Sequence, residues 1–245
     1  MQSGGPAVSE INALEAQAAR AAQSGRDAEA FSLWTRILQI DPNHSRTLNA
    51  LGMRAMRTGD FRGARAAFKR LTDSNGTEPQ QWMNLALACR QLKDEAGEES
   101  AIQRALSLDP TELVALLLRA DLLERQGKTH QAAMAYGAAA TVAPPIDRLH
   151  PDLKPAVSHA FAYRQQYDRD FAAFMDRYLE PYEQDTGERV KRFRDSLDIL
   201  VGRKRRFDSQ SVVYHYPGLA PIEFFERSEF PWLEEIEATA EAIRT

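Results

Sequence analysis

The sequence predicts a mainly α-helical solenoid, in which pairs of helices stack one after another, and two observations carry this prediction. Aligning QIDPNH (39–44), SLDPTE (107–112) and TVAPPI (141–146) places Pro42, Pro110 and Pro144 in one column, 68 and 34 residues apart. At the same period of 34, three further columns form: Gly25, Gly59 and Gly127; Ala30, Ala64 and Ala132; Trp34, Phe68, Ile102 and Tyr136. A fixed period of this length is typical of repeat architectures. We therefore expect four repeats within 11–144, with approximate registers 11–44, 45–78, 79–112 and 113–146.

The composition is that of an ordinary globular chain. Of 245 residues, 43% are hydrophobic and 27% are charged, and no apolar stretch approaches the length of a membrane span. The N-terminal segment MQSGGPAVSE lacks the pattern of a signal peptide, and the single cysteine, Cys89, excludes an intramolecular disulfide. The net charge of −4 argues against a general nucleic-acid binder. A cytoplasmic location, with neither membrane nor nucleic acid as a partner, is the expectation.

Each repeat is expected to be a helix, a tight turn and a second helix. Glycine supplies the left-handed backbone that ends the first helix, and a small alanine lets the second helix pack closely. A bulky side chain four residues later fills the space between repeats, and proline closes the second helix. The pattern departs from itself at Lys93, which replaces the turn glycine, at Glu98, which replaces the small alanine, and at Gly76, which stands where proline is expected.

These columns resemble the tetratricopeptide repeat family, whose pattern of Trp, Leu-Gly, Tyr, Ala, Phe, Ala and Pro also spans 34 residues. Trp82 occupies the tryptophan column in the third repeat, and Leu51-Gly52 the Leu-Gly column in the second. Ala30, Trp34 and Pro42 occupy the second-helix columns of the first repeat. The resemblance implies a protein-interaction solenoid.

Arrays of this kind bind through the groove that their first helices line. In the family, groove positions are the second, fifth, ninth, twelfth and thirteenth of each repeat. Here the candidate peptide-binding residues are Arg46, Asn49, Met53, Met56 and Arg57 in repeat two, Gln80, Met83, Leu87, Arg90 and Gln91 in repeat three, and Val114, Leu117, Asp121, Glu124 and Arg125 in repeat four.

Guanidinium groups beside methionines would suit an acidic or mixed peptide. The alternative is a spacer without a partner, whose polar groove is merely solvated. The Lys and Asn pair of the carboxylate clamp in chaperone-binding relatives is replaced by Glu15 and Ala19, which disfavours a chaperone-tail adaptor.

The segments that flank the repeats are expected to differ from them. Residues 1–10 are expected to be disordered, and the register is expected to stop after Pro144-Pro145. Apolar residues at helical spacing predict one long helix, or two, over 152–184, and a shorter one from Val190 to Val201. We expect 147–201 to form a helical connector that caps the solenoid.

The C-terminal segment 202–245 changes in character. SVVYHY (211–216) favours a strand because it is rich in β-branched and aromatic residues. With Tyr216-Pro217-Gly218-Leu219, Phe224-Phe225, Phe230-Pro231-Trp232-Leu233 and a helix from Leu233 to Arg244, the segment resembles the entry to the aspartyl/asparaginyl β-hydroxylase domain. The resemblance implies a strand-turn-helix piece of a truncated double-stranded β-helix.

The hydroxylase resemblance implies a parent iron(II)/2-oxoglutarate dioxygenase that hydroxylates Asp or Asn side chains, with the repeats selecting its protein substrate. In that family the iron ligands and cosubstrate residues lie downstream of these motifs, so we expect no catalytic, metal or cofactor residue among these 245. His150-Pro151-Asp152 fits a bare His-x-Asp pattern, but its proline-rich context is unlike the facing strands that carry iron ligands. The competing interpretation is a stand-alone tetratricopeptide-repeat scaffold that binds a peptide.

Overall fold

The structure is a computed structural model that describes residues 5–180, 188–200, 203–204, 230–232 and 237. The chain divides into two compact units, Met1–Lys191 and Arg192–Thr245. Every regular element of the described residues is helical, and none is a strand. The prediction of a mainly α solenoid is confirmed. The expected strand over 211–216 and the turn that follows it lie outside the described residues, as does all of the helix expected after Leu233 except residue 237.

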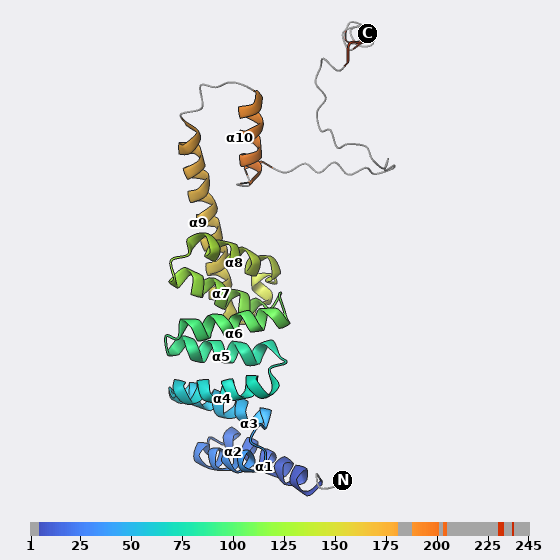
Figure 1. Cartoon of the computed structure of the whole chain (residues 1–245), viewed down its shortest axis with the longest axis vertical. Helices are drawn as coiled ribbons and strands as arrows, with labels where there is room; N and C mark the ends of the chain where they lie inside the picture. The colour runs from blue at the N-terminus through green and yellow to red at the C-terminus, as the bar shows by residue number, and fades with distance from the viewer. Residues whose placement is uncertain (1–4, 181–187, 201–202, 205–229, 233–236, 238–245) are drawn as a thin grey trace. The chain divides into compact units, whose positions relative to one another are not determined.

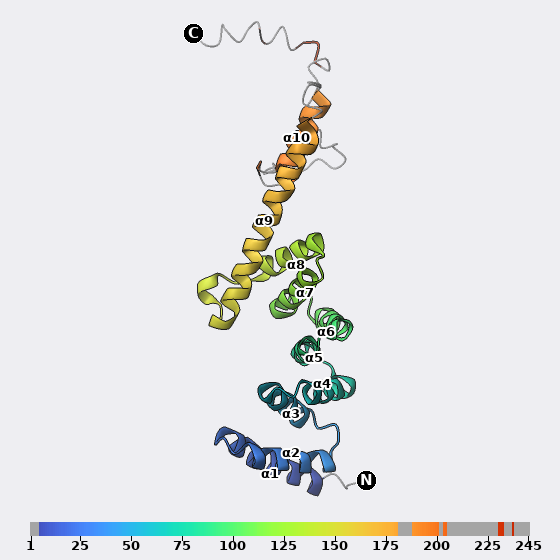
Figure 2. The same cartoon turned by 90° about the vertical axis from the view of Figure 1, so that its left-hand side faces the viewer.

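The first unit is a stack of helix pairs (Figure 1). The first helices are α1 (Gly5–Gln23), α3 (Ser45–Thr58), α5 (Pro79–Gln91) and α7 (Leu113–Arg125). The second helices are α2 (Asp27–Ile40), α4 (Phe61–Asn75), α6 (Glu95–Leu108) and α8 (Thr129–Val142). Each first helix packs against its own second helix and against the second helix of the preceding repeat. Figure 2 shows α3 and α5 along one side of the stack and α4 and α6 along the other.

The N-terminal helix begins earlier than expected. Residues 1–10 were expected to be disordered, yet α1 starts at Gly5. The stretch AVSEINALEAQAA, from Ala7 onward, is rich in alanine and glutamate, which have high helix propensity. The high helix propensity of this stretch outweighs the low helix propensity of the glycines at its start.

The turns between paired helices use the left-handed backbone that the glycine column predicts. Gly25, Gly59 and Gly127 have φ angles of 71°, 77° and 69°. In the third repeat Lys93 adopts the same conformation with φ 57°. The turn geometry is therefore kept even where the sequence lacks glycine.

Replacing Lys93 with glycine is expected to raise the free energy of unfolding by about 1 kcal/mol, because a left-handed backbone strains every residue that has a Cβ. Gly127→Lys is the matched reverse change, since a Cβ at Gly127 would meet no atom within 4 Å and would add conformational strain alone. The free energy of unfolding of Gly127→Lys, measured in urea, should be lower than that of the wild type by a similar amount. Equal stability of both variants and the wild type would contradict this account of the turns.

Two clusters of buried side chains hold the stack together. The first joins α3 to α7 and includes Phe68, Met83 and Ile102, each 2% exposed or less. The second joins α6, α7 and α8 to the helix that follows them and includes Tyr136 and Val157. The apolar core is thus continuous across the repeat boundaries from α3 to α9, as expected for a solenoid.

After α8, two short 3₁₀ turns, η1 (Ile146–Arg148) and η2 (Pro151–Leu153), lead into α9 (Lys154–Leu179). This is one long helix, in the place where one or two were expected. It packs against α8 and also contacts α7. The register was expected to stop after Pro144-Pro145, and a fifth repeat in register would begin its first helix at residue 147, where η1 lies; α9 begins at Lys154.

The shorter helix α10 (Glu188–Leu200) begins in the first unit and continues into the second. Just beyond it, Lys204 pairs with Asp195, and its Nζ atom lies 3.6 Å from Oδ2 of Asp198. Among the described residues, no helix combines the length and the apolar character needed to cross a membrane.

Candidate functional site

The first helices form a continuous inner row, because side chains of successive first helices contact one another directly. Glu15 of α1 lies 3.5 Å from Arg46 of α3. Asn84 of α5 donates a hydrogen bond to Asn49 of α3 at 3.3 Å. Later in the row Arg90 of α5 pairs with Asp121 of α7 at 2.9 Å. We call the surface of α1, α3, α5 and α7 on this side the inner groove.

In the N-terminal part of the inner groove, polar amides surround an exposed methionine. Gln80 donates to Asn84 at 3.0 Å and Asn84 donates to Asn49 at 3.3 Å, so the three amides form a chain across α3 and α5. Met53 is 51% exposed in the same row. Amide side chains both donate and accept hydrogen bonds, so each can exchange its present partner for a ligand's backbone.

The C-terminal part of the inner groove is a network of ion pairs. Both Arg90 and Arg125 approach Oδ2 of Asp121 at 2.9 Å, and Nη2 of Arg125 lies 2.6 Å from Oε1 of Glu98. Glu98 is 1% exposed, and its other oxygen, Oε2, has no partner among the described residues. Burial raises the pKa of Glu98, although Arg125 opposes the shift. The guanidinium groups expected to bind a ligand's carboxylate are therefore already engaged with carboxylates of the chain.

The candidate groove residues differ in accessibility. The exposed ones are Arg46, Asn49, Met53, Arg57, Gln80, Gln91 and Arg125. The half-buried ones are Met56, Leu87, Arg90, Val114, Asp121 and Glu124. Met83 and Leu117, at 2% and 7% exposure, belong to the two cores and offer a ligand no surface. Arg57 donates to both oxygens of Asp27 at 2.9 Å, so it too has an internal partner.

Sequence reasoning missed one residue of this surface. Asn84 stands one place beyond the fifth position of its repeat, which is not a groove position in the family pattern. It also missed His159 and Tyr163 on α9, which lie beside the groove residue Glu124 and outside the repeat register.

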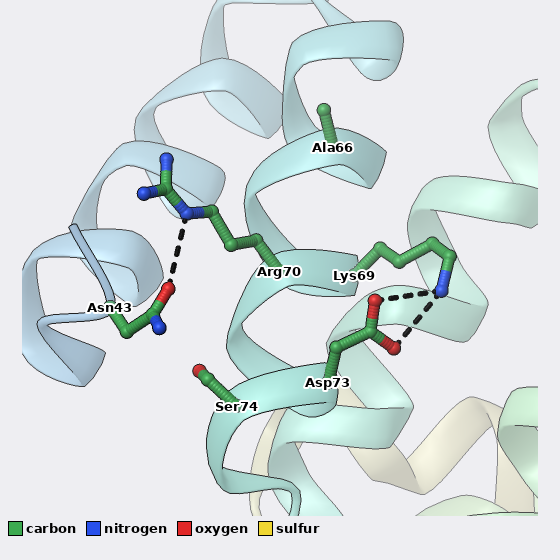
Figure 3. A pocket seen from close by; sticks show the side chains of 6 residues that line it. All are labelled: Asn43, Ala66, Lys69, Arg70, Asp73 and Ser74. Carbon is green, nitrogen blue, oxygen red and sulfur yellow. Dashed lines mark hydrogen bonds and ion pairs between the residues drawn. The ribbon is translucent and has the colours of Figure 1, made fainter.

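The outer face of the second repeat carries a separate hollow of about 390 Å³. Figure 3 shows its lining, in which Nζ of Lys69 bonds to both oxygens of Asp73 and Nε of Arg70 donates to Asn43 at 3.4 Å. It lies on α4 and on the loop before α3, away from the inner groove. Because both cations already have partners within the chain, we assign it no ligand.

The single cysteine, Cys89 of α5, lies in the first of the two cores. Cys89 is 3% exposed, and burial, followed by the charge of Asp94, raises its pKa to about 11. Since the thiolate is the nucleophile, the native thiol is expected to react with a disulfide reagent at pH 8 at least about a hundredfold more slowly than the unfolded chain does. The reaction rates of the native chain and of the urea-unfolded chain are measured by the absorbance of the released thiol after mixing. Equal rates for the two states would contradict the burial of Cys89.

The described helices form an α-solenoid of stacked helix pairs with a continuous row of first helices. The family model for the tetratricopeptide repeat matches residues 49–112, which comprise most of the second repeat and all of the third. No curated protein matches the sequence.

Solved structures support the same fold. The crystal structure of MamA protein has a TM-score of 0.55 at 18% identity, over 82% of this chain and 98% of that one. The structure of MamA 41-end from Desulfovibrio magneticus RS-1 has a TM-score of 0.50 at 17% identity, over 54% of this chain and 75% of that one. The C-terminal part of a TPR repeat-containing protein from Cytophaga hutchinsonii has a TM-score of 0.51 at 16% identity, over 71% of this chain and 64% of that one. At these identities the similarity concerns the fold alone. None of these comparisons supports the resemblance of 202–245 to the hydroxylase family.

Proposed function

We propose that this chain is a protein-interaction scaffold whose inner groove binds an extended segment of a partner protein. The observation that carries the proposal is the amide chain of Asn49, Asn84 and Gln80 beside the exposed Met53. An extended peptide has unpaired N–H and C=O groups along both edges, and side-chain amides can pair with both. Methionine adapts to varied apolar side chains, which suits the remaining contact.

The internal ion pairs of the groove favour an uncharged polar segment over the acidic one expected from the arginines. A ligand carboxylate at Arg125 would compete with Asp121 and Glu98, and one at Arg57 would compete with Asp27. Displacing the partner of a buried carboxylate leaves that charge unpaired, which is costly. A ligand that binds to the amides of Asn49, Asn84 and Gln80 leaves no buried charge unpaired, so its binding carries no such cost.

The test is selection from a displayed library of random twelve-residue peptides against the full chain, followed by affinity measurement by fluorescence polarisation. Asn84→Ala removes the centre of the amide chain and is expected to weaken an enriched peptide about tenfold, the value of one or two hydrogen bonds. Asn43→Ala, on the outer hollow, is the matched control and should leave the affinity unchanged. Equal affinities for both variants, or no enriched peptide at all, would sink the proposal and leave a spacer without a partner.

A second candidate rests on the sequence motifs of the C-terminal segment. If 202–245 begins an aspartyl/asparaginyl β-hydroxylase-like domain, the repeats would select the substrate of an iron(II)/2-oxoglutarate dioxygenase. The described residues contain no group of three His, Cys, Asp or Glu side chains that could hold a metal ion. The motif residues lie outside the described ones, apart from Phe230, Pro231 and Trp232.

The coding DNA beyond codon 245 tests this second candidate. An open frame continuing into strand-rich sequence with two well-separated histidines and an arginine would support it. A stop codon at that point would remove the dioxygenase from this chain and leave the scaffold.

A further inference from the structure

Helix α9 extends the inner groove by one more helix. It packs on α8 and contacts α7, just as α7 packs on α6 and contacts α5. His159 lies near the N-terminal end of α9, which begins at Lys154, and it meets the C-terminal end of α7. The groove residue Glu124 of α7 faces this helix, and Nε2 of His159 lies 2.8 Å from its Oε2 atom.

The carboxylate of Glu124 is held on one side only. Its Oε2 atom accepts a hydrogen bond from the Tyr136 hydroxyl at 2.5 Å and contacts the His159 ring at 2.8 Å. Its Oε1 atom accepts none from the residues that the structure describes, and 34% of the side chain is exposed. The orientation of this carboxylate is thus fixed by two partners while one oxygen is left for a ligand.

Two aromatic side chains, Tyr136 and His159, contact this carboxylate, and the ring of Tyr163 lies next to both of them. The ring of Tyr136 lies 4.9 Å from that of Tyr163 and 5.2 Å from that of His159, and His159 and Tyr163 are 5.9 Å apart. Tyr136 is buried, whereas the His159 side chain is 51% exposed and Tyr163 is half-buried. A carboxylate beside accessible ring faces is the arrangement that binds alkylammonium and guanidinium groups, through charge and cation–π attraction together.

The charged side chains around Glu124 carry a net negative charge, which favours a cationic ligand. Asp121, Glu124 and the buried Glu98 stand against two guanidinium groups, those of Arg90 and Arg125. Both of these arginines are paired with Asp121, and Arg125 also with Glu98, whereas Glu124 has no arginine partner among the residues that the structure describes. A cation on a bound ligand would therefore balance the charge of Glu124.

We propose that Glu124, His159 and Tyr163 form a subsite for a lysine or arginine side chain of the segment bound in the inner groove. The proposal rests on the groove function above and specifies its partner: an extended, largely uncharged peptide with one basic residue near the end that meets α9. The cation bonds to Oε1 of Glu124 and lies against the rings of His159 and Tyr163.

The test uses a small probe that does not depend on the unidentified peptide. N-acetyl-lysine N-methylamide and its uncharged counterpart N-acetyl-norleucine N-methylamide are titrated into the full chain, and the ring signals of His159 and Tyr163 are followed by NMR. The His159 signals are assigned by their disappearance in His159→Gln. We expect a saturable shift at millimolar concentrations of the lysine probe, weakened by added salt, and none with the norleucine probe.

Matched variants separate the carboxylate from general charge. Glu124→Gln keeps an acceptor for Tyr136 and His159 but removes the charge, and should weaken the lysine probe at least about fivefold. Glu99→Gln removes the same charge from an exposed position on α6 and should change nothing. Tyr163→Leu removes one ring and should give an intermediate loss, which guards against misfolding of any single variant.

Either of two results would overturn the subsite: equal shifts with both probes, or equal affinity of Glu124→Gln and Glu99→Gln for the lysine probe. Failure of the groove function gives a different pattern. A specific lysine shift without any enriched library peptide would refute the groove as a peptide site and keep the cation subsite. Enriched peptides that depend on Asn84, together with no lysine shift, would refute the subsite alone.

Discussion

Replacing Arg125 with methionine is expected to lower the free energy of unfolding at pH 7 by about 2–3 kcal/mol, because it removes the only ion-pair partner that the buried carboxylate of Glu98 has among the described residues. Glu98 is 1% exposed and its Oε2 atom already lacks a partner among the described residues, so the loss of the 2.6 Å contact to Arg125 leaves it wholly unpaired. The expected loss is below the usual range for a fully buried pair, since Arg125 is itself 35% exposed. Urea unfolding followed by circular dichroism measures it.

The pH dependence of this loss has a definite sign. Burial raises the pKa of Glu98, so the folded chain binds that proton more tightly than the unfolded chain does. The stabilisation from the proton is present below the ordinary pKa of a glutamate and is lost as pH rises through the raised value. Without Arg125 the shift becomes larger, and the Arg125→Met variant should therefore lose less stability at pH 5 than at pH 7.

A double-mutant cycle gives the control. Glu98→Gln removes the buried charge and is expected to lie within about 1 kcal/mol of the wild type. Combined with Arg125→Met, it should recover most of the stability lost in the single variant. Additive losses in the double variant, or a loss that grows toward pH 5, would contradict the buried pair.

The second large effect is expected at Gly52, where an added methyl group has no room. A Cβ atom there would lie 2.4 Å from Cε1 of Phe68, whose ring is 0% exposed. The ring fills the space between neighbouring helices and cannot move without opening the core. Gly52→Ala is expected to destabilise the chain by about 3 kcal/mol, the upper range for overpacking of a core. Thermal unfolding of the full chain measures it.

A control and a rescue make this prediction specific. At Gly137 a new Cβ would meet only the end of the Arg164 side chain, at 3.0 Å, and that side chain can move. Gly137→Ala should thus be neutral or stabilise by about 0.5 kcal/mol, because alanine is the better helix former. In the Gly52→Ala background, Phe68→Leu should restore part of the loss. Similar melting temperatures for both alanine variants would contradict the packing of Phe68 on Gly52.

The repeat architecture was predictable because its signals are local and recur. The glycines at 25, 59 and 127 were expected in left-handed turns, and they have that conformation. Lys93 shows that the tertiary context imposes the same turn when the glycine is missing. The helix over 152–184 was predicted from its periodicity, but the early start of α1 and the packing of α9 against both α8 and α7 were not, because the glycines at the N-terminus disguise the start of α1 and packing partners are not encoded in a local period.

The groove surface was predictable in position but not in chemistry. The register places Arg90, Asp121 and Arg125 on the inner row, but it cannot show that they pair with one another. Glu98 appeared only as a departure from the small-residue column, and its partner lies 27 residues away on another helix. Such pairings depend on side-chain conformations and on the approach of neighbouring repeats, neither of which a single-sequence pattern specifies.

The most direct test of the groove is photo-crosslinking of an enriched library peptide to the full chain. One variant carries p-benzoylphenylalanine in place of Met53, which is exposed in the inner groove, and a second carries it in place of Ala66, on the outer hollow. We expect the peptide to crosslink to the probe at position 53 and not to the one at position 66. Crosslinking at position 66 alone, or equally at both positions, would contradict an inner groove that binds the partner segment.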